Sequence, residues 1–268
     1  MSTASDTDRR FAILIDADNV SDTYIEIILD EVSNLGVATY KRIYGDWTSP
    51  RLGSWKTCLL DNSIIPMQQY SYTYGKNATD SAMIIDAMDI LYSGNVDGFA
   101  IVSSDSDFTR LAARLRESGM YVIGMGEQKT PKPFISACNQ FKYLDLLYSS
   151  KNSGAEGEGA HGGGAADESE DDAAELEFGQ MTRADRRRHM KMIRENIGAI
   201  IDQFSDDDGW VSLGLLGDQL GKRLPDFDVR NYGYKKLRPF LKSLGVYEFK
   251  EPSEESGQRQ IYLRLIKQ

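Results

Sequence analysis

Short apolar runs alternate with amphipathic segments between residues 11 and 148. The first run, residues 11–15, is wholly apolar, as in a strand covered on both faces. After Asp22, which can cap a helix, apolar residues recur at helical spacing until Gly36. The same alternation predicts strands over residues 37–44, 64–69, 98–103, 121–125 and 141–147, and helices over residues 50–60, 82–92 and 108–118.

This alternation predicts an α/β domain built on a doubly wound parallel sheet. In such sheets the functional groups lie beyond the carboxyl ends of the strands. Residues that directly follow a strand are therefore the first candidates for chemistry.

A different pattern begins near residue 182. Apolar positions predict helices over residues 186–204, 213–224 and 232–244, with a short strand at 210–211. Two strands over residues 246–250 and 260–265 would then form a hairpin around a polar turn. Three helices with a hairpin are typical of a small winged-helix (α+β) domain, which we place at residues 182–268.

The segment between the two patterns, residues 149–181, is rich in glycine and acidic residues and has little to bury. We interpret it as a flexible acidic linker, and the polar residues 1–10 as a disordered N-terminus. The net charge of −10 divides unevenly: −6 for residues 1–150, −8 for 151–181 and +4 for 182–268. The positive C-terminal part weakly favours a nucleic-acid partner.

The remaining composition excludes several classes of protein. Cys58 and Cys138 are the only cysteines, so a disulfide framework or a structural zinc site is not expected. No apolar run is long enough to span a membrane. The pattern of a secretory signal, a basic start followed by an apolar run, is not seen either. We therefore expect a soluble, cytoplasmic protein without a membrane partner.

Acidic residues gather where the predicted strands end. Asp16 follows the first strand, Asp105 and Asp107 follow the fourth, and Asp80 precedes the third helix. If the first and fourth strands are neighbours, these carboxylates converge and repel each other unless cations bind. Carboxylates suit Mg²⁺ or Mn²⁺, so all four are candidate catalytic and metal-binding residues.

The chemistry expected of such a site is phosphoryl transfer by metal-activated water. No histidine in residues 1–150 is present as a general base, which agrees with that expectation. Other readings remain: Asp107 could simply cap the helix from Phe108, Asp18 is the weakest acidic candidate, and Asp86 is an outside one.

Basic and aromatic residues indicate where nucleic acid would bind. Tyr74 and Lys76 precede Asp80 and could stack a base and bind a phosphate. Arg42 and Arg110 could flank the acidic crevice. In the second domain the candidates are Arg187 on the first helix and, on the third, Lys235, Lys236 and Arg238.

Several motifs give a specific resemblance. Residues 11–148 resemble an NYN domain of the PIN-like, LabA-like nuclease group through FAILIDADNV, YGDW, KNATD and SSDSDF. The resemblance implies that Asp16, Asp80, Asp105 and Asp107 bind metal and that Asn19 helps to orient the site. Ser104 departs from the family, which often has glycine there, so the geometry of that loop is in doubt.

The C-terminal part resembles an OST-HTH (LOTUS) domain, more loosely, through GWVSLGLLGDQL, LPDFDVRNYGYKKLRPFL and QIYLRLI. This resemblance implies binding to RNA or to an RNA-processing protein.

Together these observations predict a Mg²⁺- or Mn²⁺-dependent nuclease, an endoribonuclease that hydrolyses RNA phosphodiester bonds. Two alternatives stay open. One is a non-catalytic RNA-binding adaptor. The other is a haloacid-dehalogenase-like phosphatase, because Asp16 and Asp18 also fit the short DxDx(T/V) pattern, although Asp80 is then unexplained.

Overall fold

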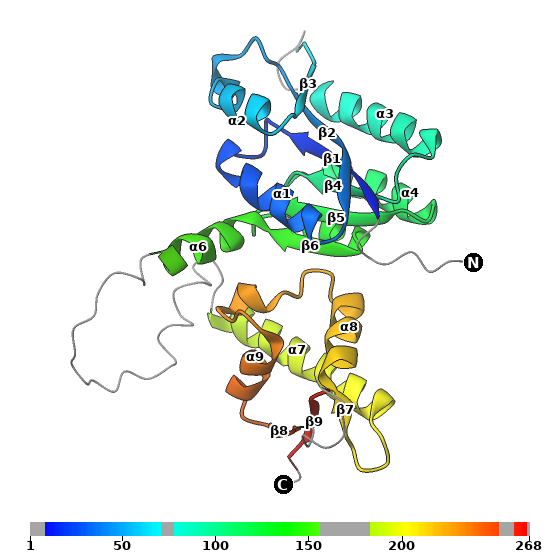
Figure 1. The fold of residues 1–268 in the computed structure, drawn as a ribbon, viewed down its shortest axis with the longest axis vertical. Helices are drawn as coiled ribbons and strands as arrows, with labels where there is room; N and C mark the ends of the chain where they lie inside the picture. The colour runs from blue at the N-terminus through cyan, green and yellow to red at the C-terminus, as the bar shows by residue number, and fades with distance from the viewer. Residues whose placement is uncertain (1–8, 71–77, 156–182, 252–259, 267–268) are drawn as a thin grey trace, which may run out of the picture. The chain divides into compact units, whose positions relative to one another are not determined.

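The computed structural model describes residues 9–70, 78–155, 183–251 and 260–266, drawn in colour in Figure 1. The chain divides into two compact units, Met1–Tyr148 and Ser149–Gln268. Among the described helices, none combines the length and the apolar character needed to cross a membrane.

The first unit is built on a six-stranded sheet in the order β3-β2-β1-β4-β5-β6, and every neighbouring pair is parallel. The strands are β1 (Arg10–Asp16), β2 (Val37–Gly45), β3 (Ile65–Gln68), β4 (Gly98–Val102), β5 (Tyr121–Gly126) and β6 (Gln140–Tyr143). The predicted doubly wound sheet is confirmed. Because β1 and β4 are neighbours, the acidic residues that follow them share one edge.

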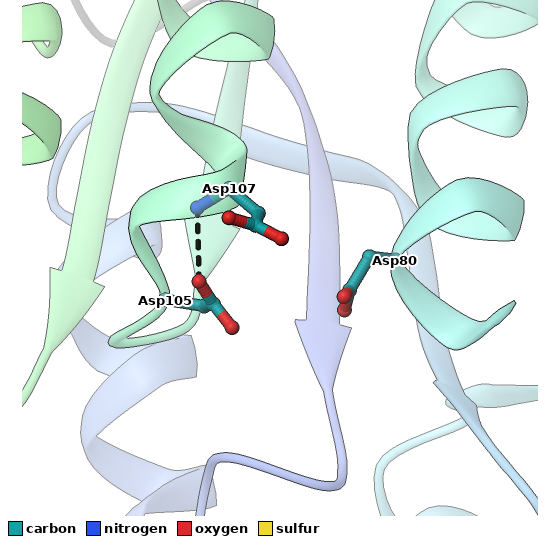
Figure 2. A group of neighbouring side chains, drawn as sticks. All are labelled: Asp80, Asp105 and Asp107. Atoms are coloured by element: carbon teal, nitrogen blue, oxygen red, sulfur yellow. Dashed lines mark hydrogen bonds between the residues drawn. The ribbon is translucent and has the colours of Figure 1, made fainter. Parts of the chain in front are cut away.

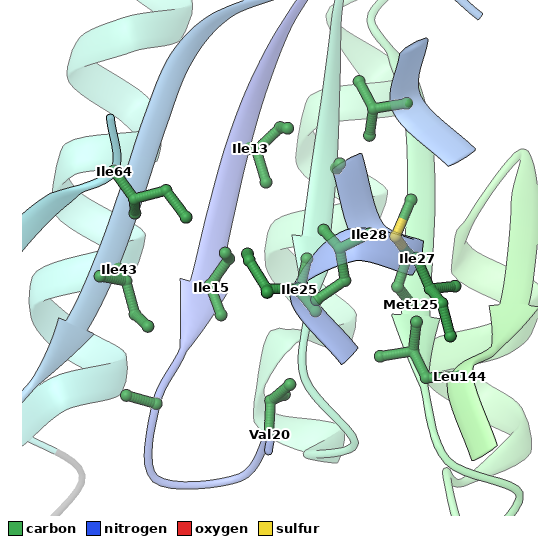
Figure 3. Close-up of a cluster of buried hydrophobic side chains, with 14 of the residues drawn as sticks. Ile13, Ile15, Val20, Ile25, Ile27, Ile28, Ile43, Ile64, Met125 and Leu144 are labelled. Carbon is green, nitrogen blue, oxygen red and sulfur yellow. The ribbon is translucent and has the colours of Figure 1, made fainter. Parts of the chain in front are cut away.

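Helices cover both faces of this sheet (Figure 1). Along β1, Ile13 and Ile15 face one hydrophobic cluster, part of which is shown in Figure 3, and Ala12 and Leu14 face the other. The first cluster is completed by α1 (Ile25–Ser33), α2 (Trp55–Asp61) and α6 (Leu144–Ala155). The second is completed by α3 (Ala78–Ser93), α4 (Thr109–Glu117) and α5 (Lys132–Ala137).

Several predicted boundaries in this unit were wrong. The helical turn before α1 is capped by the Ser21 side chain, which accepts a hydrogen bond from the Thr23 amide, and not by Asp22. The single helix expected over residues 50–60 is a 3₁₀ turn, η3 (Pro50–Leu52), followed by α2, because Gly53 and Ser54 intervene. The expected sixth strand ends at Tyr143, where α6 begins, and α5 was missed.

The second unit packs three helices and a small antiparallel sheet around one hydrophobic cluster. Its elements are α7 (Arg183–Phe204), β7 (Val211–Ser212), α8 (Leu213–Arg223), η7 (Val229–Tyr232), α9 (Leu237–Ser243), β8 (Tyr247–Lys250) and β9 (Tyr262–Leu265). The strand order is β7-β9-β8. This arrangement confirms a small α+β domain of the predicted kind.

The predicted helix over residues 232–244 was wrong in its first part: η7 ends at Tyr232, Gly233 has a φ of 78° in the left-handed region, and α9 begins only at Leu237. In the segment interpreted as a linker, α6 continues past residue 149 to Ala155. The rest of that segment, residues 156–182, and residues 1–8 lie outside the described residues.

Candidate functional site

Asp16 is the last residue of β1 and is fully buried. Its Oδ1 accepts a hydrogen bond from the Asp18 amide at 3.1 Å. Its Oδ2 accepts bonds from the Asn19 amide side chain at 2.6 Å and from Ser103 Oγ at 2.9 Å. Burial raises the pKa of this carboxyl, and the hydrogen bonds from Asn19, Ser103 and Asp18 oppose the rise. Asn19 therefore contacts Asp16 directly, and its role in orienting the site stays a prediction.

The segment after β4 carries the next two carboxylates. Ser103 Oγ accepts a hydrogen bond from the Asp105 amide at 3.1 Å, and Asp105 Oδ1 accepts one from the Asp107 amide at 2.9 Å. Asp105 is thus the cap of the 3₁₀ turn η4 (Ser106–Phe108) that leads into α4. The reading in which Asp107 caps this helix is wrong, and the Asp107 side chain is exposed at the edge of the sheet.

Asp80 lies in the first turn of α3, next to the buried Thr79. Thr79 Oγ1 donates a hydrogen bond to Asp18 Oδ2 at 3.1 Å, which ties the start of α3 to the loop after β1. Asp18, expected to be the weakest acidic candidate, therefore has a positioning contact.

Figure 2 shows Asp80 facing Asp105 and Asp107, with the end of β1 between the two sides. One carboxylate oxygen from each of these three residues lies within 4.8 Å of the other two. Burial is the largest cause that raises the pKa of Asp80, to about 6, and the negative charges of Asp16 and the other nearby aspartates add to it. Such a set of oxygen donors fits a divalent cation.

Asp16 is not a member of the three-residue group, although its charge acts on Asp80. Its two oxygens are already occupied by three donors. Ser104, between Ser103 and Asp105 in the chain, is buried, and its Oγ accepts a hydrogen bond from the Glu127 amide at 2.9 Å. The serine that replaces the frequent glycine therefore joins the loop after β4 to the end of β5.

Two residues at this edge were missed in the sequence. The sequence pattern predicts Ser103 only as the last residue of a strand. In the structure its hydroxyl donates a hydrogen bond to Asp16 and accepts one from the Asp105 amide. A serine inside a buried apolar run was the available signal, since a buried hydroxyl needs partners. Arg51 places a guanidinium nitrogen 3.6 Å from Asp18 Oδ1, and the pattern around it gave no signal of this.

The predicted RNA-contact residues have different surroundings in the first unit. Arg42 lies on β2 and forms an ion pair with Asp86 of α3, so it already has a partner within the domain. Arg110 is exposed in the first turn of α4. Tyr74 and Lys76 lie outside the described residues.

In the second unit, Arg187 is exposed on α7. Lys235 and Lys236 are exposed but precede α9, so their predicted place on the third helix was wrong. Arg238 is on α9, paired with Glu251, and its guanidinium carbon lies 5.9 Å from the centre of the Phe249 ring.

Comparison with solved structures found, among others, two proteins of unassigned function. The crystal structure of a protein of unknown function from Vibrio parahaemolyticus is 21% identical, over 53% of this chain and 97% of that one, with a TM-score of 0.45. The solution structure of an uncharacterized protein from Nitrosomonas europaea is 31% identical, over 41% of this chain and 91% of that one, with a TM-score of 0.27. At these TM-scores neither similarity supports a conclusion. A search of curated proteins found no match.

Family models match both units. The OST-HTH/LOTUS domain model matches residues 189–256, which lie within the second unit. The NYN domain model matches residues 10–145, slightly more than half of the chain and nearly all of the described sheet domain. The chain therefore belongs to the NYN domain family.

Proposed function

We propose that this chain is a divalent-metal-dependent ribonuclease that hydrolyses RNA phosphodiester bonds, with Mg²⁺ or Mn²⁺ as its cofactor. Two matches support a role in cutting or binding RNA: the NYN domain, from a PIN-like nuclease group, and the OST-HTH/LOTUS domain. The family also favours a nuclease over a haloacid-dehalogenase-like phosphatase.

The observation that carries the proposal is the convergence of Asp80, Asp105 and Asp107, whose oxygens lie within 4.8 Å of one another. These three residues would hold the cation directly. A divalent cation at such a site lowers the pKa of water and stabilises the attacking and leaving oxygens of phosphoryl transfer. The raised pKa of Asp80 agrees with a site whose own carboxylates repel each other.

The neighbouring residues would hold these ligands in place. Asp16 adds a fourth negative charge that acts on Asp80, and Asn19 and Ser103 fix its carboxylate. Ser103 couples the position of Asp16 to that of Asp105. Thr79 couples the loop that carries Asp18 to the start of α3. The ligands therefore lie after β4 and at the start of α3, next to the end of β1, and the packed core supports all three elements.

The second domain would capture RNA or an RNA-processing protein. Arg187, Lys235 and Lys236 are exposed there, as a phosphate contact requires. Because both domains belong to one chain, RNA held by the second has a raised effective concentration at the first.

Cleavage of labelled single-stranded RNA in Mn²⁺, in Mg²⁺ and in EDTA tests this proposal. Asp80→Asn and Asp105→Asn are compared with Asp89→Asn, a matched control on an exposed position of the same helix as Asp80. We expect metal-dependent cleavage that both site variants lose and the control keeps. Equal cleavage by every variant would indicate a contaminating nuclease. RNA binding without cleavage in any metal would favour the adaptor alternative.

A further inference from the structure

The acidic edge has to admit a polyanion. The negative charges of Asp16, Asp18, Asp105 and Asp107 all act on Asp80. An RNA strand brings one negative charge per phosphate, and the phosphates on either side of the cleaved bond are attracted less strongly by a cation held at its centre, because the attraction falls with distance and is screened by salt. Fixed cations at the borders of the site would offset this repulsion.

Arg51 is such a cation on the β2 side. It belongs to η3, which follows β2, and Leu52 beside it packs into the cluster that also contains Ala17. The Arg51 side chain is 81% exposed, and its ion pair with the acidic edge within the described part of the chain is to Asp18, at 3.6 Å. A guanidinium has five N–H donors in a planar fork, so this long contact leaves donors that can bind a phosphate.

Arg110 is the corresponding cation on the β4 side. It is exposed in the first turn of α4, three residues after Asp107. In the sheet, β1 lies between β2 and β4, so Arg51 and Arg110 come from opposite sides of Asp16. The ends of β2 and β4 are two strand spacings, about 10 Å, apart. Because η3 packs on one face of the sheet and α4 on the other, an RNA strand that met both arginines would cross the edge of the sheet from one face to the other.

We propose that Arg51 and Arg110 are phosphate anchors on opposite sides of the acidic group, so that a single RNA strand crosses the edge of the sheet from β2 to β4. This inference rests on the proposed ribonuclease function and adds the path of the substrate. The competing explanation is that Arg51 only steadies Asp18. Arg114 provides a matched control, because it lies one turn beyond Arg110 on α4 and donates to Ser118 near the far end of that helix.

The test is steady-state cleavage of a labelled oligouridylate in Mn²⁺ over a range of salt concentrations, together with calorimetric Mn²⁺ titration. Arg51→Ala and Arg110→Ala should each raise KM about tenfold, as expected for the loss of a charged hydrogen bond, with Mn²⁺ affinity unchanged. Each should also flatten the slope of log(kcat/KM) against log[salt] by about 0.7. Arg114→Ala should match the wild type.

Other outcomes overturn the proposal. If Arg51→Ala weakens Mn²⁺ binding and lowers kcat without a change in KM or salt slope, Arg51 acts through Asp18 alone. If Arg114→Ala raises KM as much as Arg110→Ala does, the rise comes from the loss of positive charge in general and not from the loss of a specific phosphate contact. Should the wild type bind the oligouridylate without cutting it, the ribonuclease proposal fails. Fluorescence anisotropy then tests the two anchors separately, by measuring the affinity of each variant for the oligouridylate. Unchanged affinity in both Arg51→Ala and Arg110→Ala would refute the proposed phosphate contacts.

Discussion

The hydroxyl of Ser103 lies 2.9 Å from Asp16 Oδ2 and joins the ends of β1 and β4 inside the first domain. Both residues are fully buried. Ser103 Oγ also accepts a hydrogen bond from the Asp105 amide. One small side chain therefore links the buried carboxylate of Asp16 to the loop that carries two of the three grouped aspartates.

Ser103→Ala should therefore destabilise the domain and weaken metal binding together. It removes a donor from a buried carboxylate and an acceptor from a backbone amide, at a cost of about 1–3 kcal/mol in the free energy of unfolding. Urea denaturation and Mn²⁺ titration measure the two effects. The exposed Ser106 is the control, and Ser106→Ala should change neither. Wild-type metal affinity in Ser103→Ala would show that Asp105 does not depend on this link.

The contribution of Asp80 to the stability of the metal-free protein should fall as pH rises towards neutrality. The pKa of Asp80 is raised from 3.8 to about 6, so the folded state binds its proton more tightly than the unfolded state. Stability from this group is full below the unfolded pKa and is lost as pH rises through the folded pKa. Asp80→Asn should stabilise the metal-free protein more at about pH 7.5 than at about pH 4, where the wild-type carboxyl is largely protonated.

Metal should reverse this trend, because a cation binds the ionised carboxylate and must compete with its proton. Thermal denaturation with and without Mn²⁺ should give a larger rise in Tm at about pH 7.5 than at about pH 5. The exposed-site variant Asp89→Asn should behave as the wild type does. A shift in Tm that is the same at both pH values would mean that the cation does not bind Asp80.

The parallel sheet, and the edge of it at which the acidic residues gather, could be predicted because both depend on local patterns in the sequence. Wholly apolar runs mark strands buried on both faces, and parallel strands bring their carboxyl ends to one edge. That was enough to place Asp16 and Asp105 at the same edge, whereas their convergence was predicted only on the condition that the first and fourth strands are neighbours. The order itself, with β1 next to β4, is set by packing between distant segments, and the alternation of elements only allowed it.

Side-chain partners were not predictable in the same way. Arg42 was expected at the crevice, but its side chain points to α3, where it meets Asp86. The i-to-i+4 spacing of a helix says which residues share a face, whereas the partner of a strand residue depends on how the helix lies across the sheet. The helix over 232–244 failed for a local reason: Gly233 adopts a left-handed φ and interrupts it.

Asp86 should prove to be a structural residue and not a metal ligand. It receives hydrogen bonds from Arg42 and from Tyr44 Oη between β2 and α3, and the Arg42 and Asp86 side chains are only 24% and 16% exposed. Asp86→Ala leaves a largely buried guanidinium without its partner, which costs about 3–5 kcal/mol for a buried pair. Urea denaturation should show this loss, while Mn²⁺ affinity of the folded variant stays at the wild-type value. A lost metal site with unchanged stability would place Asp86 in the metal centre instead.

A side chain at Gly98 should destabilise the first domain, because Gly98 begins β4 in close contact with neighbouring strands. A Cβ atom there would lie 2.5 Å from Cε1 of Phe11 and 2.6 Å from the carbonyl oxygen of Tyr121. The Tyr121 oxygen belongs to the β5 backbone, so relief requires a shift of the strand, and Gly98→Ala should cost about 1–3 kcal/mol or more. Calorimetric unfolding tests this against Gly198→Ala on α7, where a Cβ would meet no atom within 4 Å. Since alanine is the better helix former by about 1 kcal/mol, Gly198→Ala should raise the Tm of the second domain. A Gly98→Ala protein as stable as the wild type would mean that β4 and β5 can separate at this point without loss of packing.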